Sequence, residues 1–238
     1  MDLSTFQQYT AWHAEWNHRQ YAAPAEPWRL VEVPLTEVTY FTNEIRLNWG
    51  LGRVQGGDWG VDGDHRLLRE TPRYCSLEQH FEKGVPWERT ELYARAAQQI
   101  ESGNQVRGYE SLGAFRERRC EYIDDLYRSI KTEGYRPNEK EGHHPADDNA
   151  FEDAYAHHLE PLVVIDRDGE PLLTEGFHRF IIADLLQLDS IPVYVLCRHV
   201  EWQRTRDRVA GVPSGEFPEK LSSLRCHPDL TDIMSSSG

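Results

Sequence analysis

The stretch Gly176-Phe177-His178-Arg179 carries the residue types in this sequence that are best suited to binding an anion. Apolar residues recur at helical spacing from Phe177 onward, so the glycine is expected where a strand turns into a helix. Backbone N–H groups and the positive end of the helix dipole make a helix start an anion site. Gly176 lets a ligand approach the backbone closely, and Arg179 can donate two hydrogen bonds to a phosphate or carboxylate. His178 can donate a hydrogen bond or transfer a proton near neutral pH.

Each of these side chains also has a structural alternative. His178 could cap a strand end, and Arg179 could pair with Glu175 or Asp184 to hold the fold. The surroundings favour a site, because Glu175 precedes the glycine and Arg198-His199 follows the next expected strand. If the two strands are adjacent and parallel, their carboxyl ends open into one crevice, where ligands usually bind. On that condition, Arg198 and His199 are expected to line the same mouth as His178.

Strands and turns around this loop must position it. Leu162–Ile165 is an apolar run of strand length, and Asp166–Gly169 after it is typical of a hairpin turn. A second short segment, Pro171–Thr174, leads into the loop, and a helix follows. Ile191–Leu196 then indicates a further strand, with another helix after His199.

The upstream half predicts a strand and turn over Trp28–Val38 and then a helical insertion over about residues 76–136, close to the size of a small subdomain. Residues 1–27 are expected to form a polar, aromatic-rich arm without a core pattern. The insertion contains three expected helices: Ser76–Gly84 with a capping box, Trp87–Ile100 capped near Thr90, and a helix that Ser111 caps and Gly134 ends.

The segment Trp49–Gly60 is rich in glycine and tryptophan and has two interpretations. It could be a tight hairpin or loop in which indoles fill the space that glycines leave. Gly-rich segments are turns more often than sites, so this interpretation is favoured. It could instead be a lid over a ligand, with indoles for stacking and Asp58 as a carboxylate.

Residues 137–158 are acidic and rich in histidine, and a solvated loop is favoured there over a metal site. His and Asp are metal ligands, but adjacent histidines diverge on a regular backbone and no His-x-x-x-His spacing is present. No metal ligand is therefore assigned. Residues 211–238 are expected to form a C-terminal tail whose last residues are disordered.

Length and cysteine usage limit the class of protein. A chain of 238 residues fits one large domain, or a domain with an insertion, and can bury a core without disulfides. No apolar run reaches membrane-spanning length, and the N-terminus is too polar for a signal peptide. The four cysteines are scattered without a Cys-x-x-Cys pair, which indicates a reduced cytoplasmic protein.

The chain is strongly acidic, which limits the kinds of partner that it is expected to bind. The formal net charge is −14, and the basic residues are nearly all arginine. An acidic, lysine-poor surface keeps a protein soluble at high salt, so a halophilic, salt-adapted cytoplasm is a hypothesis that folding in dilute buffer would contradict. Broad nucleic-acid binding needs a basic footprint, so DNA is not favoured as a partner, although a local basic groove remains open.

These features together resemble the core signature of the ParB/sulfiredoxin superfamily: a strand, a hairpin, an acid-Gly-x-(His or Arg)-Arg phosphate loop, a helix and an Ile-Pro-Val strand. The matching residues are Ile165–Gly169, Glu175–Arg179, Ala183, Leu186 and Ile191–Val193, and Trp28–Tyr40 resembles the strand and turn that open the same domain. The resemblance implies an α+β fold with a ParB/sulfiredoxin-like mixed sheet and helix core. That domain would span residues 28–210, with its core in about 28–60 and 155–210 and the helical segment as an insertion.

By this resemblance, the loop Gly176–Arg179 holds the phosphates of a nucleoside triphosphate or diphosphate, usually with Mg²⁺. Family members hydrolyse CTP, reduce sulfinic acids, phosphorylate free serine or cleave DNA. Phe177 stands where sulfiredoxins carry a cysteine, so that chemistry lacks its nucleophile. The residues after the core are expected to be too few for the DNA-binding domain of segregation proteins. The loop sequence is most similar to that of the kinase-like branch, in which an acid near the ligand serves as general base. Glu175 and Asp58 are the candidates for that base.

Three functions follow from this resemblance. The first is a nucleotide-dependent enzyme, an NTP hydrolase or a phosphotransferase with a small-molecule acceptor. In it, Arg179 and backbone N–H groups from Gly176 onward would stabilise the transferred phosphoryl group, and His178 would contact phosphate or move a proton. The second is a nucleotide- or DNA-binding module without turnover. The third is a metal-dependent DNA nuclease, which the net charge disfavours.

Overall fold

The computed structural model describes residues 3–45, 47–59, 66–138, 159–212 and 219–235. Most of the acidic, histidine-rich segment predicted to be a solvated loop lies outside these ranges, as do the last residues of the predicted tail. None of the described helices combines the length and the apolar character needed to cross a membrane.

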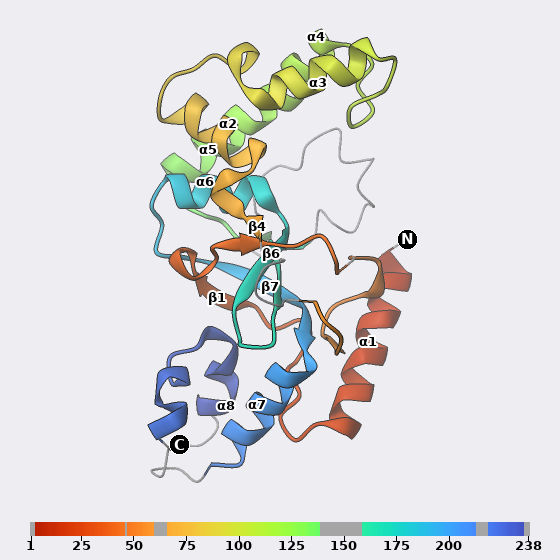
Figure 1. Ribbon diagram of the computed structural model, residues 1–238, viewed down its shortest axis with the longest axis vertical. Coiled ribbons are helices and arrows are strands. Elements are labelled where there is room, and N and C mark those ends of the chain that lie inside the picture. The colour runs from red at the N-terminus through yellow and green to blue at the C-terminus, as the bar shows by residue number, and fades with distance from the viewer. Residues whose placement is uncertain (1–2, 46, 60–65, 139–158, 213–218, 236–238) are drawn as a thin grey trace.

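Figure 1 shows the helices and strands of the described chain. The strands are β1 (Val31–Pro34), β2 (Tyr40–Phe41), β3 (Arg53–Gln55), β4 (Arg66–Leu67), β5 (Leu162–Ile165), β6 (Pro171–Glu175) and β7 (Ser190–His199). The helices are α1 (Leu3–Gln20), α2 (Pro72–Phe81), α3 (Glu91–Glu101), α4 (Leu112–Ala114), α5 (Glu121–Glu133), α6 (Phe177–Leu185), α7 (Val200–Ala210) and α8 (Thr231–Ser235). A π-helical segment, Phe115–Cys120, joins α4 to α5.

The seven described strands form a mixed sheet in the order β1-β7-β5-β6-β2-β4, and β3 pairs with the carboxyl end of β7. Strand β5 pairs antiparallel with β6 and parallel with β7. A mixed sheet with helices packed around it is the α+β class that the sequence predicts. Because β6 runs opposite to both β5 and β7, the carboxyl ends of β6 and β7 lie at opposite ends of the sheet.

The predicted hairpin between β5 and β6 is confirmed, and Asp166 organises its turn. The Oδ1 atom of Asp166 accepts hydrogen bonds from the backbone N–H groups of Asp168, Gly169 and Glu170 at 2.8–2.9 Å. An aspartate that bonds its own backbone in this way stabilises a tight reversal of the chain. Gly169 has a φ of 101°, and a Cβ atom there would overlap the ring of Trp202. The turn therefore requires both the aspartate and the glycine.

Alternate residues of the central strands point to opposite faces of the sheet, and both faces are buried. Val163 and Ile165 of β5 join a core that includes α6 and the helices of residues 72–133. Leu162 and Val164 join a second core with Phe6 of α1. A strand buried on both faces reads as a continuous apolar run, which is why β5 was recognisable in the sequence.

Residues 72–133 form what we call the helical subdomain, which packs on α6 at one side of the sheet (Figure 1). Two of its predicted N-caps are confirmed, since Thr90 accepts a hydrogen bond at the start of α3 and Ser111 at the start of α4. The predicted end of α5 is also confirmed, because Gly134 follows it with a φ of 76°. A capping side chain and a left-handed glycine are local signals, so the sequence alone located these ends.

The capping box predicted at Ser76 is wrong. Helix α2 begins one turn earlier, where Thr71 is the N-cap and Pro72 is the first helical residue. Ser76 is buried inside the helix, and its hydroxyl accepts a hydrogen bond from the N–H of Leu92 at 2.9 Å. Proline at the first position of a helix is a known start signal, and it outweighs the serine that follows.

The predicted N-terminal arm is a long helix, α1, whose buried face is mostly polar: Phe6, Thr10, His13 and Asn17. The hydroxyl of Thr10 accepts a hydrogen bond from the N–H of Leu51 at 2.9 Å. The amide of Asn17 donates to the carbonyl of Gly52 at 2.7 Å. Because α1 docks through polar side chains, its sequence lacks the apolar stripe that marks an amphipathic helix.

The segment predicted to be a C-terminal tail packs into the fold through a buried ion network. Asp229 is fully buried, and Arg198 donates to it through Nε at 2.9 Å and Nη2 at 2.5 Å. The indole of Trp202 donates to the same carboxylate at 2.9 Å, and Arg206 lies 3.3 Å from it. Burial alone would raise the pKa of Asp229, but the guanidinium groups hold it well below its usual range.

We expect Asp229→Ala to lower the free energy of unfolding by about 3–5 kcal/mol, because it removes the carboxylate that buried Arg198 and Arg206 share, and only Arg206 also pairs with Asp232. Asp125→Ala is the control, since Asp125 and Arg128 form an exposed ion pair at 2.6 Å. Such pairs contribute at most about 1 kcal/mol. Urea unfolding followed by tryptophan fluorescence measures both values, and equal losses would show that the buried network adds nothing beyond a surface pair.

Candidate functional site

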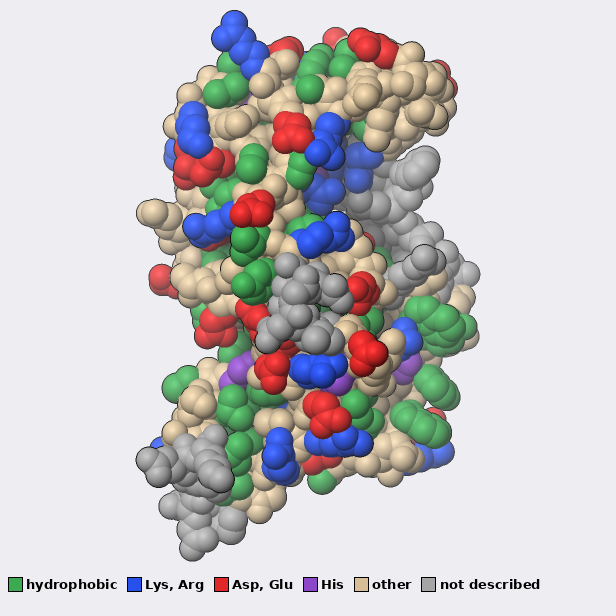
Figure 2. Space-filling model, in the orientation of Figure 1, with side chains coloured by type: hydrophobic (Ala, Val, Ile, Leu, Met, Phe, Trp, Pro, Cys, Tyr) green, Lys and Arg blue, Asp and Glu red, His purple; other side chains and the backbone are tan. Residues whose placement is uncertain are grey.

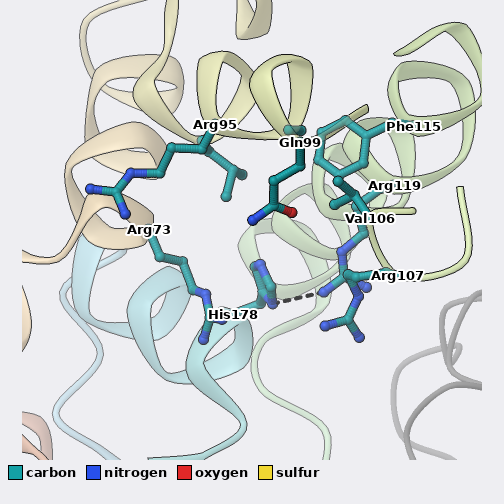
Figure 3. Close-up of a pocket in the computed structure, with 10 residues that line it drawn as sticks. Arg73, Arg95, Gln99, Val106, Arg107, Phe115, Arg119 and His178 are labelled. Carbon is teal, nitrogen blue, oxygen red and sulfur yellow. Dashed lines mark hydrogen bonds between the residues drawn. The ribbon is translucent and has the colours of Figure 1, made fainter. Parts of the chain in front are cut away.

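A cavity of about 170 Å³ lies between the helical subdomain and the first turn of α6. Its charged lining comes from five separate segments: Arg73 of α2, Arg95 of α3, Arg107 of the α3–α4 connection, Arg119 of the π segment and His178 of α6. The imidazole of His178 points into the cavity, with the guanidinium groups of Arg73 and Arg107 on either side of it (Figure 3). In the space-filling view, basic side chains gather in the hollow beneath the helical subdomain (Figure 2).

Arg119 fixes the tautomer of His178. The Nη2 atom of Arg119 lies 3.2 Å from Nδ1 of His178, and a guanidinium group only donates hydrogen bonds (Figure 3). Nδ1 must therefore accept, and the neutral ring carries its proton on Nε2. His178 thus offers a hydrogen-bond donor without a positive charge of its own.

Burial lowers the pKa of His178 well below its ordinary value, and repulsion by Arg119, Arg73 and Arg107 lowers it further. The ring is therefore neutral at neutral pH. The unfolded chain takes up a proton at this residue near pH 6.5, whereas the folded chain does not. Because the unfolded state binds more protons there, this group makes the stability of the fold decrease as the pH drops below that value.

Different contacts hold the arginines in place. The guanidinium carbon of Arg73 lies 4.5 Å from the ring centroid of Phe177, which ties α2 to the first residue of α6. Arg95 pairs with Glu91 on the preceding turn of α3 at 2.7 Å. Arg107 has a φ of 51°, a left-handed conformation that is uncommon for a residue other than glycine. Such strained residues cluster at ligand-binding sites, which is consistent with the place of Arg107 in the lining.

The predicted junction of strand, glycine and helix is confirmed. Strand β6 ends at Glu175, Gly176 has left-handed φ and ψ angles of 79° and 22°, and α6 begins at Phe177. A Cβ atom on Gly176 would lie 2.6 Å from the Cα atom of Pro161. The close approach that requires a glycine here is made by the protein's own chain, at the entry to β5.

Arg179 is not among the residues that line the cavity. Its Nη1 atom lies 3.1 Å from Oε2 of Glu160, a carboxylate that is 2 % exposed, and its Nη2 donates to the carbonyl of Leu159. The hydroxyl of Tyr135 donates to the same Glu160 oxygen at 2.7 Å. Arg179 therefore has a structural role, but its partner is Glu160 and not Glu175 or Asp184. It joins α6 to the segments that precede β5 and follow α5.

Arg198 and His199 do not line the same mouth as His178, so that expectation is wrong. They end β7, whose carboxyl end lies opposite to that of β6, because the β5–β6 hairpin reverses the chain between them. Arg198 is buried against Asp229. The Nε2 atom of His199 lies 3.1 Å from the carbonyl oxygen of Gly57.

The two candidate general bases also lie apart. The carbonyl of Gly57, next to Asp58, accepts a hydrogen bond at 3.3 Å from Arg167 in the β5–β6 turn, so Asp58 lies at the turn end of the sheet. Glu175 ends β6 beside the loop, but it is not among the cavity-lining residues that the structure describes. The glycine- and tryptophan-rich segment that carries Asp58 therefore lies away from the Gly176 loop.

The four arginines of the cavity are the residues that sequence reasoning missed. The loop motif drew attention to one short stretch, whereas the arginines come from segments that are far apart in the chain. Two helical spacings were available as signals, because Arg95 and Gln99, like Phe115 and Arg119, are four residues apart and share a helix face. A further signal was the use of arginine, rather than lysine, in an acidic chain.

The geometry thus defines an anion-binding cavity beside a helix start. Its donors are guanidinium groups and the Nε2–H of a neutral histidine, and its remaining walls are largely apolar. Compared with protein-family models, with curated proteins and with solved structures, the chain gives no match.

We expect Gly176→Ala to lower the free energy of unfolding by about 2 kcal/mol or more. An alanine is strained in the left-handed conformation of residue 176, and its Cβ atom would also overlap Pro161. The matched control is Gly113→Ala, since Gly113 lies in α4 and an added Cβ meets nothing within 4 Å. That change should be neutral or stabilising by up to about 1 kcal/mol. Thermal and urea unfolding of the two variants compare the values, and a tolerated Gly176→Ala would contradict the requirement for glycine.

We expect Arg119→Gln to raise the pKa of His178, because it removes one of the positive charges that repel the imidazolium form. The pKa should still lie below the ordinary range, since burial is the larger cause and remains. An NMR pH titration of the ring signals, assigned with His178→Gln, measures the change. In the native chain, the same spectra should show a neutral ring protonated on Nε2, and a ring protonated on Nδ1 would refute the contact with Arg119.

Proposed function

We propose that the chain binds a phosphate-bearing ligand in this cavity and is a nucleotide-dependent enzyme, an NTP hydrolase or phosphotransferase of the ParB/sulfiredoxin type. The observation that carries the proposal is the convergence of Arg73, Arg107, Arg119 and His178 on one cavity at the start of α6 (Figure 3). Arg95 also lines this cavity, but its guanidinium group pairs with Glu91. In a chain with a net charge of −14, this is a strong local concentration of positive charge.

The donor set suits phosphate better than a single carboxylate. One guanidinium fork satisfies a planar carboxylate, whereas a phosphate group presents oxygens in several directions and carries up to two charges. Donors that come from α2, α3, the π segment and α6 approach from different sides, as a tetrahedral anion requires. A partly desolvated cavity also strengthens each charge-assisted hydrogen bond.

Two features of the chain support the ParB/sulfiredoxin type within this proposal. A strand leads through Glu175 and a left-handed Gly176 directly into a helix whose first turn supplies His178 to the cavity. The hairpin before it and the strand after it also pair within one mixed sheet. In this proposal His178 contacts phosphate through its Nε2–H, Arg119 positions that ring, and Arg179 holds α6 in place.

The resemblance also implies Mg²⁺, which the described lining does not fit. Mg²⁺ takes oxygen ligands, chiefly carboxylates and water, whereas the charged groups of the lining are guanidinium groups that repel a dication. Among the residues that the structure describes, no three His, Cys, Asp or Glu side chains are arranged to hold a metal ion. We therefore derive no step through Mg²⁺, and the arginines supply the charge that would stabilise a transferred phosphoryl group.

One observation favours the second function, a nucleotide-binding module without turnover. The two acids considered as general bases do not line the cavity, and the described lining contains no other aspartate or glutamate. A general base must come within hydrogen-bond reach of the proton that it abstracts. Binding of a phosphate compound without turnover is therefore the alternative outcome, whereas a DNA nuclease gains no support from an acidic chain.

We expect Arg119→Gln to weaken the binding of phosphate compounds about tenfold or more, because a hydrogen bond to a charged group contributes about 1.5–3 kcal/mol. Arg73→Gln is a second variant on the more exposed side of the cavity. Arg128→Gln is the control, since Arg128 is exposed on α5 and pairs with Asp125. Calorimetric titration with each nucleoside triphosphate and with inorganic phosphate measures the affinities, and the proposal fails if none of them binds.

Turnover separates the enzyme from the binding module. We expect release of phosphate or diphosphate when the chain is incubated with a nucleoside triphosphate and Mg²⁺, at low and at high salt. The release should disappear in Arg119→Gln and persist in Arg128→Gln. Binding that depends on Arg119 without any release would instead support the binding module.

A further inference from the structure

The volume of the cavity limits the part of a ligand that can lie inside it. At about 170 Å³, it is smaller than the roughly 300–1,000 Å³ of pockets that enclose ligands of drug size. An apolar cavity of about 150 Å³ holds one benzene molecule, so this cavity has room for about six to ten non-hydrogen atoms. A phosphate group with two or three carbons fills that space, whereas a whole nucleotide does not fit within it.

The lining also divides into a polar and an apolar part. His178 and Arg119 mark the polar part, where the anion would lie. Val106 and Phe115 lie together on one wall (Figure 3), and Leu92 and Ala96 of α3 complete the apolar part. An apolar wall next to the donors favours a carbon substituent on the anion over water.

Gln99 lies across the cavity from His178, and its amide points toward the imidazole (Figure 3). An amide both donates and accepts hydrogen bonds, so it can contact an ester oxygen or a hydroxyl group as well as a phosphate oxygen. Since Gln99 and His178 come from α3 and α6, a ligand that contacts both bridges these two helices across the cavity.

We propose that the ligand held in the cavity is a compact phosphomonoester with a short, uncharged carbon substituent, and that any nucleoside lies outside the cavity. The inference rests on the proposed function, because it takes the arginines and His178 as a phosphate site. It goes further by assigning the substrate class: the small molecule that accepts or carries the phosphoryl group, rather than the nucleotide, fills the space between α3 and α6.

The experiment compares three probes on the full chain: inorganic phosphate, propyl phosphate and adenosine 5′-monophosphate. Binding is followed by the NMR signals of the His178 ring, so that only binding at this cavity is counted. We expect propyl phosphate to bind about tenfold more tightly than inorganic phosphate, because its three carbons are buried on the apolar wall. We also expect it to bind more tightly than adenosine 5′-monophosphate.

Val106→Phe tests the apolar wall directly, because it fills that part of the cavity and leaves the arginines in place. We expect propyl phosphate to bind no more tightly than inorganic phosphate in this variant, because its carbons lose their space on the apolar wall. An NMR spectrum with native-like dispersion shows that the variant is folded. Gln99→Leu is a second variant, placed on the exposed side of α3, and it should weaken propyl phosphate without raising the affinity for adenosine 5′-monophosphate.

The possible results separate this inference from the proposed function. If inorganic phosphate binds at His178 but adenosine 5′-monophosphate binds as tightly as propyl phosphate or more tightly, the compact ligand is refuted and the phosphate site stands. The compact ligand is also refuted, and the phosphate site stands, if propyl phosphate binds no more tightly than inorganic phosphate. If no probe shifts the His178 signals, both the inference and the phosphate site are refuted.

Discussion

The direction of β6 is the constraint on which the rest of the structure depends. The carboxylate of Asp166 ties three successive backbone N–H groups into a tight turn, so β6 must run back along β5. Strand β7 then pairs with the other edge of β5 in the parallel direction. The loop after β6 therefore emerges at one end of the sheet, where the helical subdomain covers it, and the end of β7 emerges at the other.

The two ends of the sheet carry different arrangements of charged side chains. At the α6 end, arginines surround a cavity, and the histidine among them remains neutral. At the end of β7, Arg198, Arg206 and Arg29 pair with Asp229, and these ion pairs hold the last described segment of the chain. We propose that the first arrangement attracts an anion from solution, whereas the second has its anion built into the chain. Arginine suits both, because its fork remains charged when it is buried.

Local signals predicted the elements well. The apolar run of β5, the Asp-Gly turn, the glycine at the start of α6 and the caps at Thr90 and Ser111 each depend on a few neighbouring residues. The capping box at Ser76 is the local signal that failed, because Pro72 starts the helix one turn earlier. The other failures depended on distant partners. Helix α1 docks through Thr10 and Asn17, whose polarity suggested an arm without a core pattern. The prediction that Arg198 and His199 lie beside His178 failed because strand order is a property of the whole sheet. The arginines of the cavity were missed because they come from four separate segments.

The ion pair between Arg179 and Glu160 has a consequence for how fast and how tightly the cavity can bind. His178 and Arg179 are adjacent on α6, and the anchored arginine leaves the first turn little freedom to rotate. The imidazole is therefore already oriented before a ligand arrives, with Arg119 holding its other nitrogen. A preformed site loses little conformational entropy on binding, so more of the contact energy is retained as affinity. Entry of the anion would then be limited by diffusion toward a positive cavity rather than by rearrangement of the fold.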